Sequence, residues 1–153
     1  MSQVKPIPEG FHSITPHLCI KGAAQAIDFY KQAFGAEEIF RMPSPDGRIL
    51  HAEIKIGDSI VMLADEFSEM CEPATWGNPP VTIHLFVRDA DAVFERAIAS
   101  GAKVGMPIQD MFWGDRYGSL KDPFGHNWSI ATRKRDLSPD EMAKAAEQAF
   151  APR

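Results

Sequence analysis

Hydrophobic and polar side chains alternate with a period of two over residues 14–20 and 49–56, a pattern that predicts half-buried strands. Further strands are predicted over residues 37–42 and 59–64 in the first half, and over 81–88, 103–109, 117–121 and 128–132 in the second. Helical spacing follows the first stretch of each half, over residues 23–34 and 90–100, and each helix is predicted to end at a glycine. Ser138-Pro-Asp-Glu141 is a capping box with proline at the first helical position, so a third helix is predicted over 139–150.

The two halves also resemble each other residue by residue. Thr15-Pro-His17-Leu-Cys-Ile-Lys-Gly-Ala matches Thr82-Ile-His84-Leu-Phe-Val-Arg-Asp-Ala, and Gly57-Asp-Ser-Ile60 matches Gly125-His-Asn-Trp128. A period of about 67 residues is too long for a solenoid unit and too short for two independent domains. We therefore expect one α+β domain of two tandem βαβββ modules, with a C-terminal helix outside the repeat. The expected bounds are about 12–66 for module 1, 67–80 for a linker, 81–133 for module 2 and 139–150 for the helix.

Composition excludes several classes of partner. The 153 residues carry a formal net charge of −5, and Lys and Arg form no dense block, so neither nucleic acid nor an anionic membrane is expected as a partner. No apolar stretch approaches the ~20 residues that span a bilayer. Residues 1–10 lack the apolar run of a signal peptide, and Cys19 and Cys71 show no CxxC spacing. These features indicate a cytoplasmic protein with reduced cysteines.

Four segments carry a resemblance to a known family. They are Thr15–Gly35, Asp46-Gly-Arg-Ile-Leu-His51-Ala-Glu53, Phe112-Trp-Gly-Asp-Arg-Tyr-Gly118 and Asp122-Pro-Phe-Gly-His-Asn-Trp128. Together with the repeat, they make the chain similar to the vicinal-oxygen-chelate superfamily of glyoxalase I, bleomycin-resistance proteins, fosfomycin-resistance enzymes and extradiol dioxygenases. The PhnB-like branch is the most similar. The resemblance implies paired modules whose sheets curl around a shared cleft, and commonly a homodimer.

The resemblance also bears on a metal. In the metalloenzymes of this superfamily, the ligands come from the first and last strands of each module. Carried over to this sequence, those positions fall on Thr15, Thr82, about Val61 and Ser129. Hydroxyls and aliphatic groups are poor ligands beside imidazole and carboxylate, so the usual metal site is not expected. A displaced divalent metal at His17 and His84 stays open as a less favoured interpretation, because alternation keeps both on the cleft-facing side.

Other residues are candidates for contacts with an organic ligand. His51 and Glu53 share a strand face that should line the cleft, since Leu50, Ala52, Ile54 and Ile56 are expected to cover the helix side. Phe86 has the same parity as His84, and Trp113 and Tyr117 offer flat apolar faces. The predicted ligand-binding residues are His17, His51, Glu53, His84, Phe86, Trp113 and Tyr117. A purely structural role stays open for each of them. A structural role is favoured for Asp115 and Arg116, Met62 and Ile130 are assigned to the core, and Asp65 and Glu66 to solvated surface.

These observations are compatible with three alternative functions. The first is a protein that binds a small organic molecule in the cleft without the usual metal. The second is a metal-dependent lyase, isomerase or dioxygenase, in which the metal is a Lewis acid and Glu53 the general base. The third is a partner-binding protein that uses the acidic segment 65–80.

Overall fold

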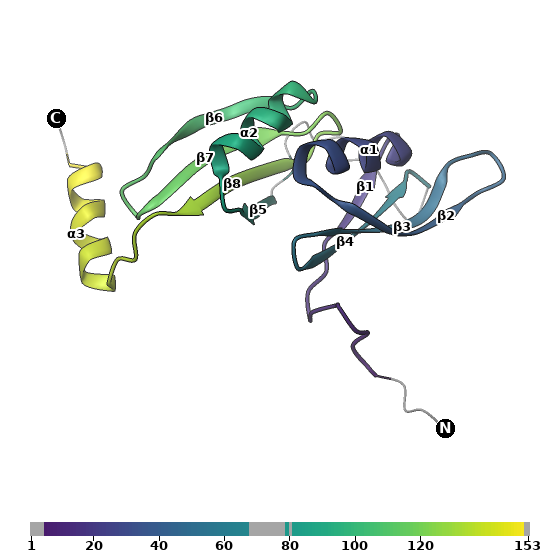
Figure 1. The fold of residues 1–153 in the computed structure, drawn as a ribbon, viewed down its shortest axis with the longest axis horizontal. Coiled ribbons are helices and arrows are strands. Elements are labelled where there is room, and N and C mark those ends of the chain that lie inside the picture. The colour runs from purple at the N-terminus through teal and green to yellow at the C-terminus, as the bar shows by residue number, and fades with distance from the viewer. Residues whose placement is uncertain (1–4, 68–78, 80, 152–153) are drawn as a thin grey trace. The chain divides into compact units, whose positions relative to one another are not determined.

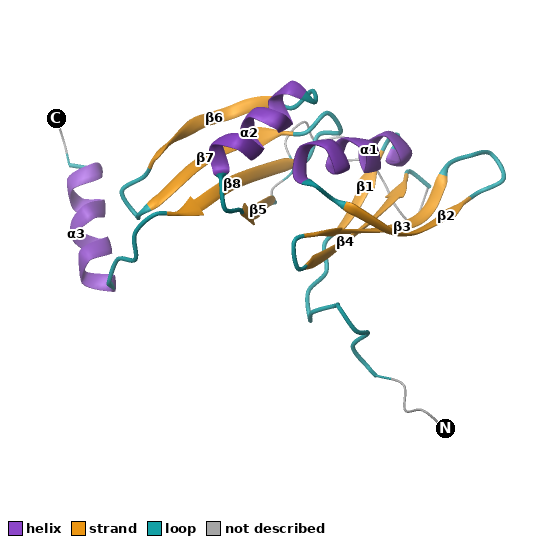
Figure 2. Ribbon diagram, viewed as in Figure 1, coloured by secondary structure: helices purple, strands orange, loops and turns teal. Residues whose placement is uncertain are grey.

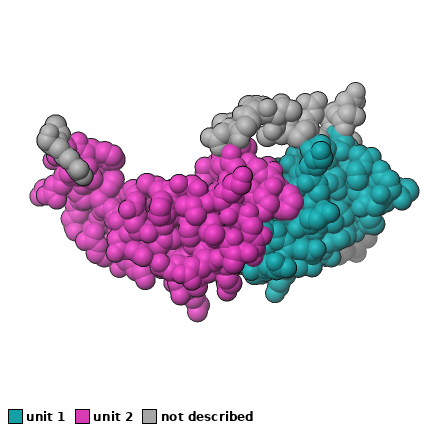
Figure 3. Space-filling model, turned by 90° about the horizontal axis from the view of Figure 1, so that it is seen from above, with its two compact units in different colours: residues 1–77 teal, residues 78–153 magenta. Residues whose placement is uncertain are grey.

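The structure, a computed structural model, describes residues 5–67, 79 and 81–151. The chain divides into two compact units, residues 1–77 and 78–153 (Figure 3). Unit 1 contains β1 (His17–Ile20), α1 (Ala23–Phe34), β2 (Glu37–Pro43), β3 (Ile49–Ile56) and β4 (Ser59–Asp65). Unit 2 contains β5 (Thr82–Phe86), α2 (Ala90–Ala99), β6 (Lys103–Asp110), β7 (Asp115–Lys121), β8 (Asn127–Arg133) and α3 (Pro139–Ala149) (Figure 1).

Each unit holds one four-stranded mixed sheet. The strand order is β1-β4-β3-β2 in unit 1 and β5-β8-β7-β6 in unit 2. The first strand of each unit pairs in parallel with the last, and the other pairs are antiparallel. The predicted α+β fold of two tandem βαβββ modules and a C-terminal helix is thus confirmed.

Each sheet packs one face against the helix of its own unit (Figure 2). The apolar stripe of the helix and alternate strand residues are removed from water there, at a gain of about 1.5–3 kcal/mol for each large side chain. The largest fully buried side chains are Ile20, Ile27, Tyr30, Ile49, Ile54 and Leu63 in unit 1 and Leu120, Trp128 and Ile130 in unit 2. We call the opposite face of each sheet its open face, because no helix among the described residues of the same unit covers it.

The termini of the helices follow the sequence signals. Gly35 ends α1 in the left-handed conformation, with φ of 68°, and its N–H bonds back to the last turn. The side chain of Asp89 accepts a hydrogen bond from the N–H of Ala92 at the start of α2. Ser138 and Glu141 form the predicted capping box of α3, although no residue of α3 is fully buried.

One strand departs from the expected alternation. On β3, Ile49 is buried at 1 % exposure, whereas Leu50 is 42 % exposed. The pairing of β2 with β3 shifts register between Met42 and Pro43, which is the signature of a β-bulge. The prediction that Leu50 covers the helix side is therefore wrong. Alternation resumes at His51, and the predicted common face of His51 and Glu53 is confirmed.

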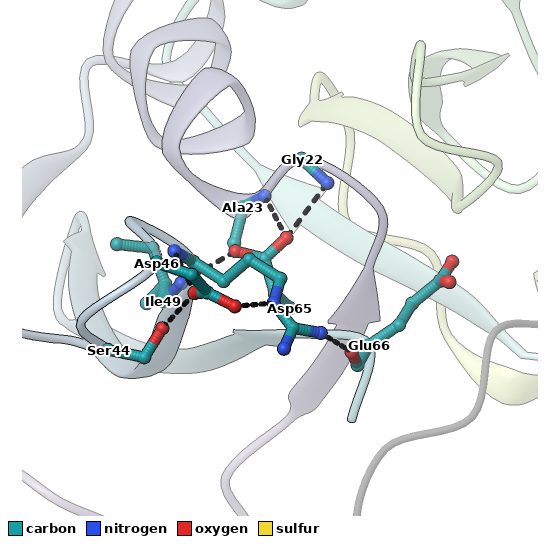
Figure 4. Close-up of polar contacts among 8 residues, drawn as sticks. Gly22, Ala23, Ser44, Asp46, Ile49, Asp65 and Glu66 are labelled. Carbon is teal, nitrogen blue, oxygen red and sulfur yellow. Dashed lines mark hydrogen bonds and ion pairs between the residues drawn. The ribbon is translucent and has the colours of Figure 1, made fainter. Parts of the chain in front are cut away.

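A buried carboxylate joins the last strand of unit 1 to its helix (Figure 4). Asp65 is only 7 % exposed, and its Oδ1 accepts hydrogen bonds from the N–H groups of Gly22 at 2.9 Å and Ala23 at 3.0 Å. Its Oδ2 accepts from the N–H of Ile49 at 2.7 Å. The first N–H groups of a helix have no partner within the helix, so a carboxylate there satisfies them. The prediction that Asp65 is a solvated surface acid is wrong.

Unit 2 has the same connection with a different side chain. The hydroxyl of Thr132, on the last strand, accepts a hydrogen bond from the N–H of Ala90 at 2.8 Å and donates one to the carbonyl of Val87 at 2.8 Å. Each last strand therefore holds the first turn of the helix in its own unit.

Candidate functional site

A row of three side chains crosses the open face of unit 1. His17 on β1 is in register with Met62 on β4, and Met62 is in register with Glu53 on β3. Residues in register on neighbouring strands point to the same face of a sheet. The prediction that Met62 is a core residue is therefore wrong, because its half-buried side chain lies on the open face beside His17 and Glu53.

A histidine–carboxylate pair lies on this face. His51 Nε2 is 3.0 Å from Glu53 Oε2, and both side chains are partly buried. The ring of His17 lies 6.0 Å from that of His51, centre to centre. Partial burial first, and repulsion from a charged His51 second, lower the pKa of His17 below its usual 6.5. His17 thus lies beside the His51–Glu53 pair, with its pKa shifted toward the uncharged imidazole.

The N-terminal segment forms a cavity over the same face. It has a volume of about 600 Å³, and Thr15, Glu53 and Met62 form the wall on the side of the sheet. The residues Pro6, Ile7, Pro8, Phe11, His12 and Ser13 line the other side. Glu53 therefore has one oxygen bonded to His51 and a side chain that borders this open cavity.

Four aromatic rings meet on the open face of unit 2, and we call them the aromatic cluster: His84, Phe86, Trp113 and Tyr117. His84 meets Phe86 edge-on with ring centres 4.6 Å apart, and stacks with Tyr117 at 6.1 Å. Trp113 meets Tyr117 edge-on at 5.4 Å. Phe86 is 56 % exposed, so part of this apolar surface faces solvent. The structure thus brings together four of the seven predicted ligand-binding residues.

Two further features define this surface. His84 Nδ1 lies 2.6 Å from Ser129 Oγ, which fixes the orientation of the imidazole ring. Beside the aromatic cluster lies a cavity of about 490 Å³, and Tyr117 belongs to both. The other lining residues are Thr82, Lys103, Val104, Gly105, Ser119, Leu120, Lys121, Asn127 and Trp128. Sequence reasoning missed the lysines, because their pairing depends on strand register.

The polar residues of the 112–118 segment have structural partners, as predicted for Asp115 and Arg116. Asp115, at 4 % exposure, accepts hydrogen bonds from Trp113 Nε1 at 3.2 Å and from Arg133 Nε at 2.7 Å. Arg116 points to the helix side and donates to Asp91 on α2 at 3.0 and 3.1 Å. This hydrogen bond lowers the pKa of the Asp91 carboxyl. Arg116 therefore cannot reach a ligand on the open face.

Atoms from other parts of the chain lie close to the glycines of the 112–118 segment. A Cβ atom added at Gly114, where φ is 101°, would lie 2.5 Å from the carbonyl oxygen of Arg135. A Cβ added at Gly118 would lie 3.0 Å from the ring of Phe94 on α2. The close approach predicted from these glycines is present, and protein atoms account for it.

The Asp122–Trp128 motif is also structural. Asp122 is buried and accepts hydrogen bonds from the N–H groups of Phe124 and His126, each at 2.9 Å. Its second oxygen accepts from Trp128 Nε1 at 2.9 Å. The carboxylate thus closes the turn between β7 and β8 and satisfies the buried indole of Trp128.

The strand register corrects one of the four positions that correspond to the metal ligands of the superfamily. His84 pairs with Ser129 and His17 pairs with Met62, so Met62 corresponds to Ser129. Val61 instead pairs with Ile54 on the helix side and is buried. Matching Gly57 with Gly125 shifts the comparison by one residue, because the loops they occupy, 57–58 and 122–126, differ in length.

These positions do not fit the divalent metal of the superfamily. The hydroxyls of Thr15, Thr82 and Ser129 and the thioether of Met62 are poor ligands for such an ion, and Ser129 Oγ is already bonded to His84. Among residues 5–67, 79 and 81–151, no three His, Cys, Asp or Glu side chains are grouped closely enough to hold a metal ion. A displaced site at His17 and His84 stays a prediction, since one histidine belongs to each unit.

Two further expectations concern the cysteines and the acidic segment 65–80. Cys19 is disulfide-bonded, which differs from the reduced state expected. Cys71 and most of the acidic segment 65–80 lie outside the described residues, so a partner-binding role for that segment stays a prediction. No helix in the described part of the chain is long and apolar enough to cross a bilayer.

Comparisons with known proteins agree with the fold. Residues 10–130 match the family model described as the Glyoxalase/Bleomycin resistance protein/Dioxygenase superfamily. The uncharacterized protein Mb0911c of Mycobacterium bovis is 46 % identical over 138 residues, covering 87 % of this chain and 91 % of that protein. TioX from Micromonospora sp. ML1 is 27 % identical, with a TM-score of 0.64 over 83 % of this chain and 100 % of TioX.

A third structure shares the fold alone. It is a mutant of the fosfomycin resistance protein FosX from Listeria monocytogenes, complexed with Mn(II) and 1S,2S-dihydroxypropylphosphonic acid. It is 15 % identical to this chain, with a TM-score of 0.61 over 86 % of this chain and 94 % of FosX.

Proposed function

The chain belongs to the glyoxalase/bleomycin resistance protein/dioxygenase superfamily, and we propose that it binds a small organic molecule on the open faces of its sheets. One fold of this kind supports many activities, so the proposal rests on the side chains of this chain. The observation that carries it is the aromatic cluster beside the cavity of about 490 Å³ in unit 2. Sites for small molecules typically have volumes of about 300–1,000 Å³ and combine apolar walls with a few polar groups.

The aromatic cluster supports binding through its exposed surface. Edge-on and offset contacts between aromatic rings contribute about 0.5–1.5 kcal/mol beyond the area that they bury. The rings of Phe86 and Tyr117 are already held by His84, so a planar ligand would meet a preformed surface. A preformed surface costs less ordering entropy on binding.

Polar contacts in unit 1 extend the proposal. Glu53 and His51 offer an acceptor and a ring nitrogen beside the cavity of about 600 Å³, and His17 adds an imidazole on the same face. A molecule with hydroxyl or carbonyl groups would find complementary partners there. We also propose, from the family resemblance, that two copies of the chain form a homodimer.

A second candidate is an enzyme of the same superfamily, a lyase, isomerase or dioxygenase. The observation that favours it is the 3.0 Å contact between Glu53 and His51 at the wall of a cavity. In that case Glu53 is the general base, and His51 orients it. No step is assigned to a metal, because the hydroxyl and thioether side chains at the strand positions do not suit one.

Ligand-observed saturation-transfer NMR with indole and benzamide tests the binding proposal. Wild-type protein is expected to transfer saturation to both compounds, and Tyr117→Ala is expected to lose most of the transfer. Ile39→Ala, which truncates an exposed side chain on β2, is the control and should behave as wild type. Absence of transfer from the wild type, or equal transfer from Tyr117→Ala, would contradict the proposal.

A further inference from the structure

We propose that Asp115 is a positioning residue for the aromatic cluster. Its carboxylate orients two of the four rings, Trp113 directly and Phe86 through Arg133. The inference rests on the proposed function, because it gives Asp115 a part in ligand binding as well as in folding. The two carboxylate oxygens have different partners: Oδ2 accepts a hydrogen bond from Trp113 Nε1 at 3.2 Å, and Oδ1 accepts one from Arg133 Nε at 2.7 Å.

Strand register places this carboxylate beside the rings. Asp115 on β7 is in register with Arg133 on β8, and the next pair along the same face is Tyr117 with Ala131. Ala131 is in turn in register with Phe86 on β5. Asp115 and Arg133 therefore form a row of the open face that directly adjoins the row of Tyr117 and Phe86.

The hydrogen bond to Asp115 determines how the indole of Trp113 is turned. Trp113 meets Tyr117 edge-on at 5.4 Å and Phe112 edge-on at 5.0 Å, and such apolar contacts do not specify the direction of the indole N–H. An indole has a single N–H to donate, and Asp115 accepts it. The bond thus selects which edge of the indole faces the aromatic cluster.

Arg133 extends the effect of Asp115 to a second ring. Its guanidinium carbon lies 5.9 Å from the ring centre of Phe86, within the range of a cation–π contact. The guanidinium also approaches Asp136 at 3.6 Å, but the side chain of Asp136 is 95 % exposed, and exposed ion pairs contribute little. The buried carboxylate of Asp115 is therefore the group that fixes the guanidinium against Phe86.

The backbone of the turn before β7 is held independently of this carboxylate. The carbonyl of Gly114 accepts hydrogen bonds from the N–H groups of Lys134 at 2.9 Å and Arg135 at 3.0 Å. The N–H of Met111 donates to the backbone carbonyl of Asp115 at 2.8 Å. None of these bonds uses the side chain at position 115. Loss of the carboxylate is thus expected to free the indole and the guanidinium while the turn keeps its course.

Asp115→Asn tests the inference, because an amide of the same shape has one accepting oxygen for two donors. We expect the indole ¹H–¹⁵N resonance of Trp113, assigned with Trp113→Phe, to shift in this variant. The resonance of Trp128, whose indole is bonded to Asp122, should stay at its wild-type position and report that unit 2 is folded. The affinity for benzamide, measured by NMR titration, is expected to fall about fivefold, as for loss of one hydrogen bond.

Two further variants complete the experiment. Asp136→Asn removes the exposed carboxylate from the same guanidinium and is the matched control, so both readouts should equal those of the wild type. Arg133→Gln carries the test if Asp115→Asn does not fold. Its amide can still donate to Asp115 but presents no cation to Phe86, so the affinity for benzamide should fall, and an unchanged affinity would overturn the inference.

The outcomes separate the inference from the proposed function. A folded Asp115→Asn protein that binds benzamide as the wild type does would overturn the inference and leave the proposed function standing, whether or not its thermal midpoint is lower. A reduced affinity with the Trp113 resonance unchanged would also overturn it, because the effect would not pass through the indole. If the wild type binds neither benzamide nor indole, the proposed function fails and the inference fails with it.

Discussion

Asp65 and Thr132 perform the same task at equivalent positions of the two units. Asp65 Oδ1 accepts a hydrogen bond from the N–H of Ala23, the first residue of α1, and Thr132 Oγ1 accepts one from the N–H of Ala90, the first residue of α2. The internal duplication has thus preserved a connection between strand and helix while the connecting group changed from a carboxylate to a hydroxyl.

Removing the Asp65 carboxylate should destabilise the protein. Asp65→Ala leaves the N–H groups of Gly22, Ala23 and Ile49 without their acceptor, and we expect the free energy of unfolding to fall by about 2–4 kcal/mol. Urea denaturation measures the change. Asp58→Ala, at an exposed hairpin position, should stay within about 0.5 kcal/mol of wild type. Equal effects of the two substitutions would contradict the assigned role of Asp65.

The pKa of His17 should lie below 6.5, and His51→Gln should raise it only in part, because burial contributes more to the shift than the charge of His51. NMR titration of the His17 ring proton measures both values. His126→Gln is the control and should leave the titration of His17 unchanged.

The same shift predicts the direction of a pH effect on stability. With a lowered pKa in the folded state, the unfolded chain binds more protons between that pKa and 6.5, so the contribution of His17 to stability rises with pH through this window. His17→Gln should reduce this slope in urea titrations at successive pH values. A slope that is the same in the variant would contradict the prediction.

Substitution of two glycines with positive φ separates the cost of backbone strain from the cost of steric contact with neighbouring atoms. Gly47→Ala, at φ of 89° with no atom within 4 Å of the added Cβ, should cost about 1–2 kcal/mol from backbone conformation alone. Gly114→Ala, at φ of 101°, also meets a carbonyl oxygen at 2.5 Å and should cost clearly more. Thermal or urea unfolding measures both. A smaller cost at Gly114 than at Gly47 would mean that the chain near Arg135 moves easily.

Elemental analysis of protein purified without chelator tests the metal alternative. We expect less than one equivalent of any divalent metal, because Thr82, Ser129 and Met62 provide hydroxyl and thioether groups at the strand positions. A full equivalent that is lost in His17→Ala or His84→Ala would instead support a displaced site and the metal-dependent enzyme. Lys144→Met, prepared in the same way, controls for metal bound non-specifically.

Ser129→Ala should release the imidazole of His84, whose Nδ1 lies 2.6 Å from the serine hydroxyl. We expect the ¹⁵N shift of His84 Nδ1 to change, because the hydrogen bond that favours one ring tautomer is lost. Ser119→Ala, in register with Ser129 on the same face, removes a hydroxyl that is bonded to Met106 and should leave this shift unchanged.

The sequence predicts most of the architecture because its signals are local. Alternation of polar and apolar residues marks the strands, and Gly35, Asp89 and the Ser138–Glu141 box mark helix ends through the geometry of the residues themselves. The same alternation predicts that His51 and Glu53 share a face, which the structure confirms.

The predictions fail where the pairing between strands determines which face or position a residue occupies. Leu50 follows the alternation in sequence, but a bulge opposite Met42 and Pro43 turns it outward. A match through the shared glycine pairs Val61 with Ser129, whereas loops of different length shift the register so that Met62 is the equivalent residue. Asp65 reads as a surface acid unless its position next to the start of α1 is known. Register and long-range contacts are not encoded in single residues.

The bulges in β2 and β6 have a consequence for the behaviour of the protein at high concentration. Both strands lie at the outer edge of their sheets, where a row of free backbone groups can recruit a strand from another molecule and begin aggregation. An irregular register, together with Pro43 on β2 and Pro107 on β6, interrupts the regular ladder that such recruitment requires. The extra residue of β2, between Glu38 and Phe40, thus lies on an edge strand, where it works against the addition of further strands to the sheet.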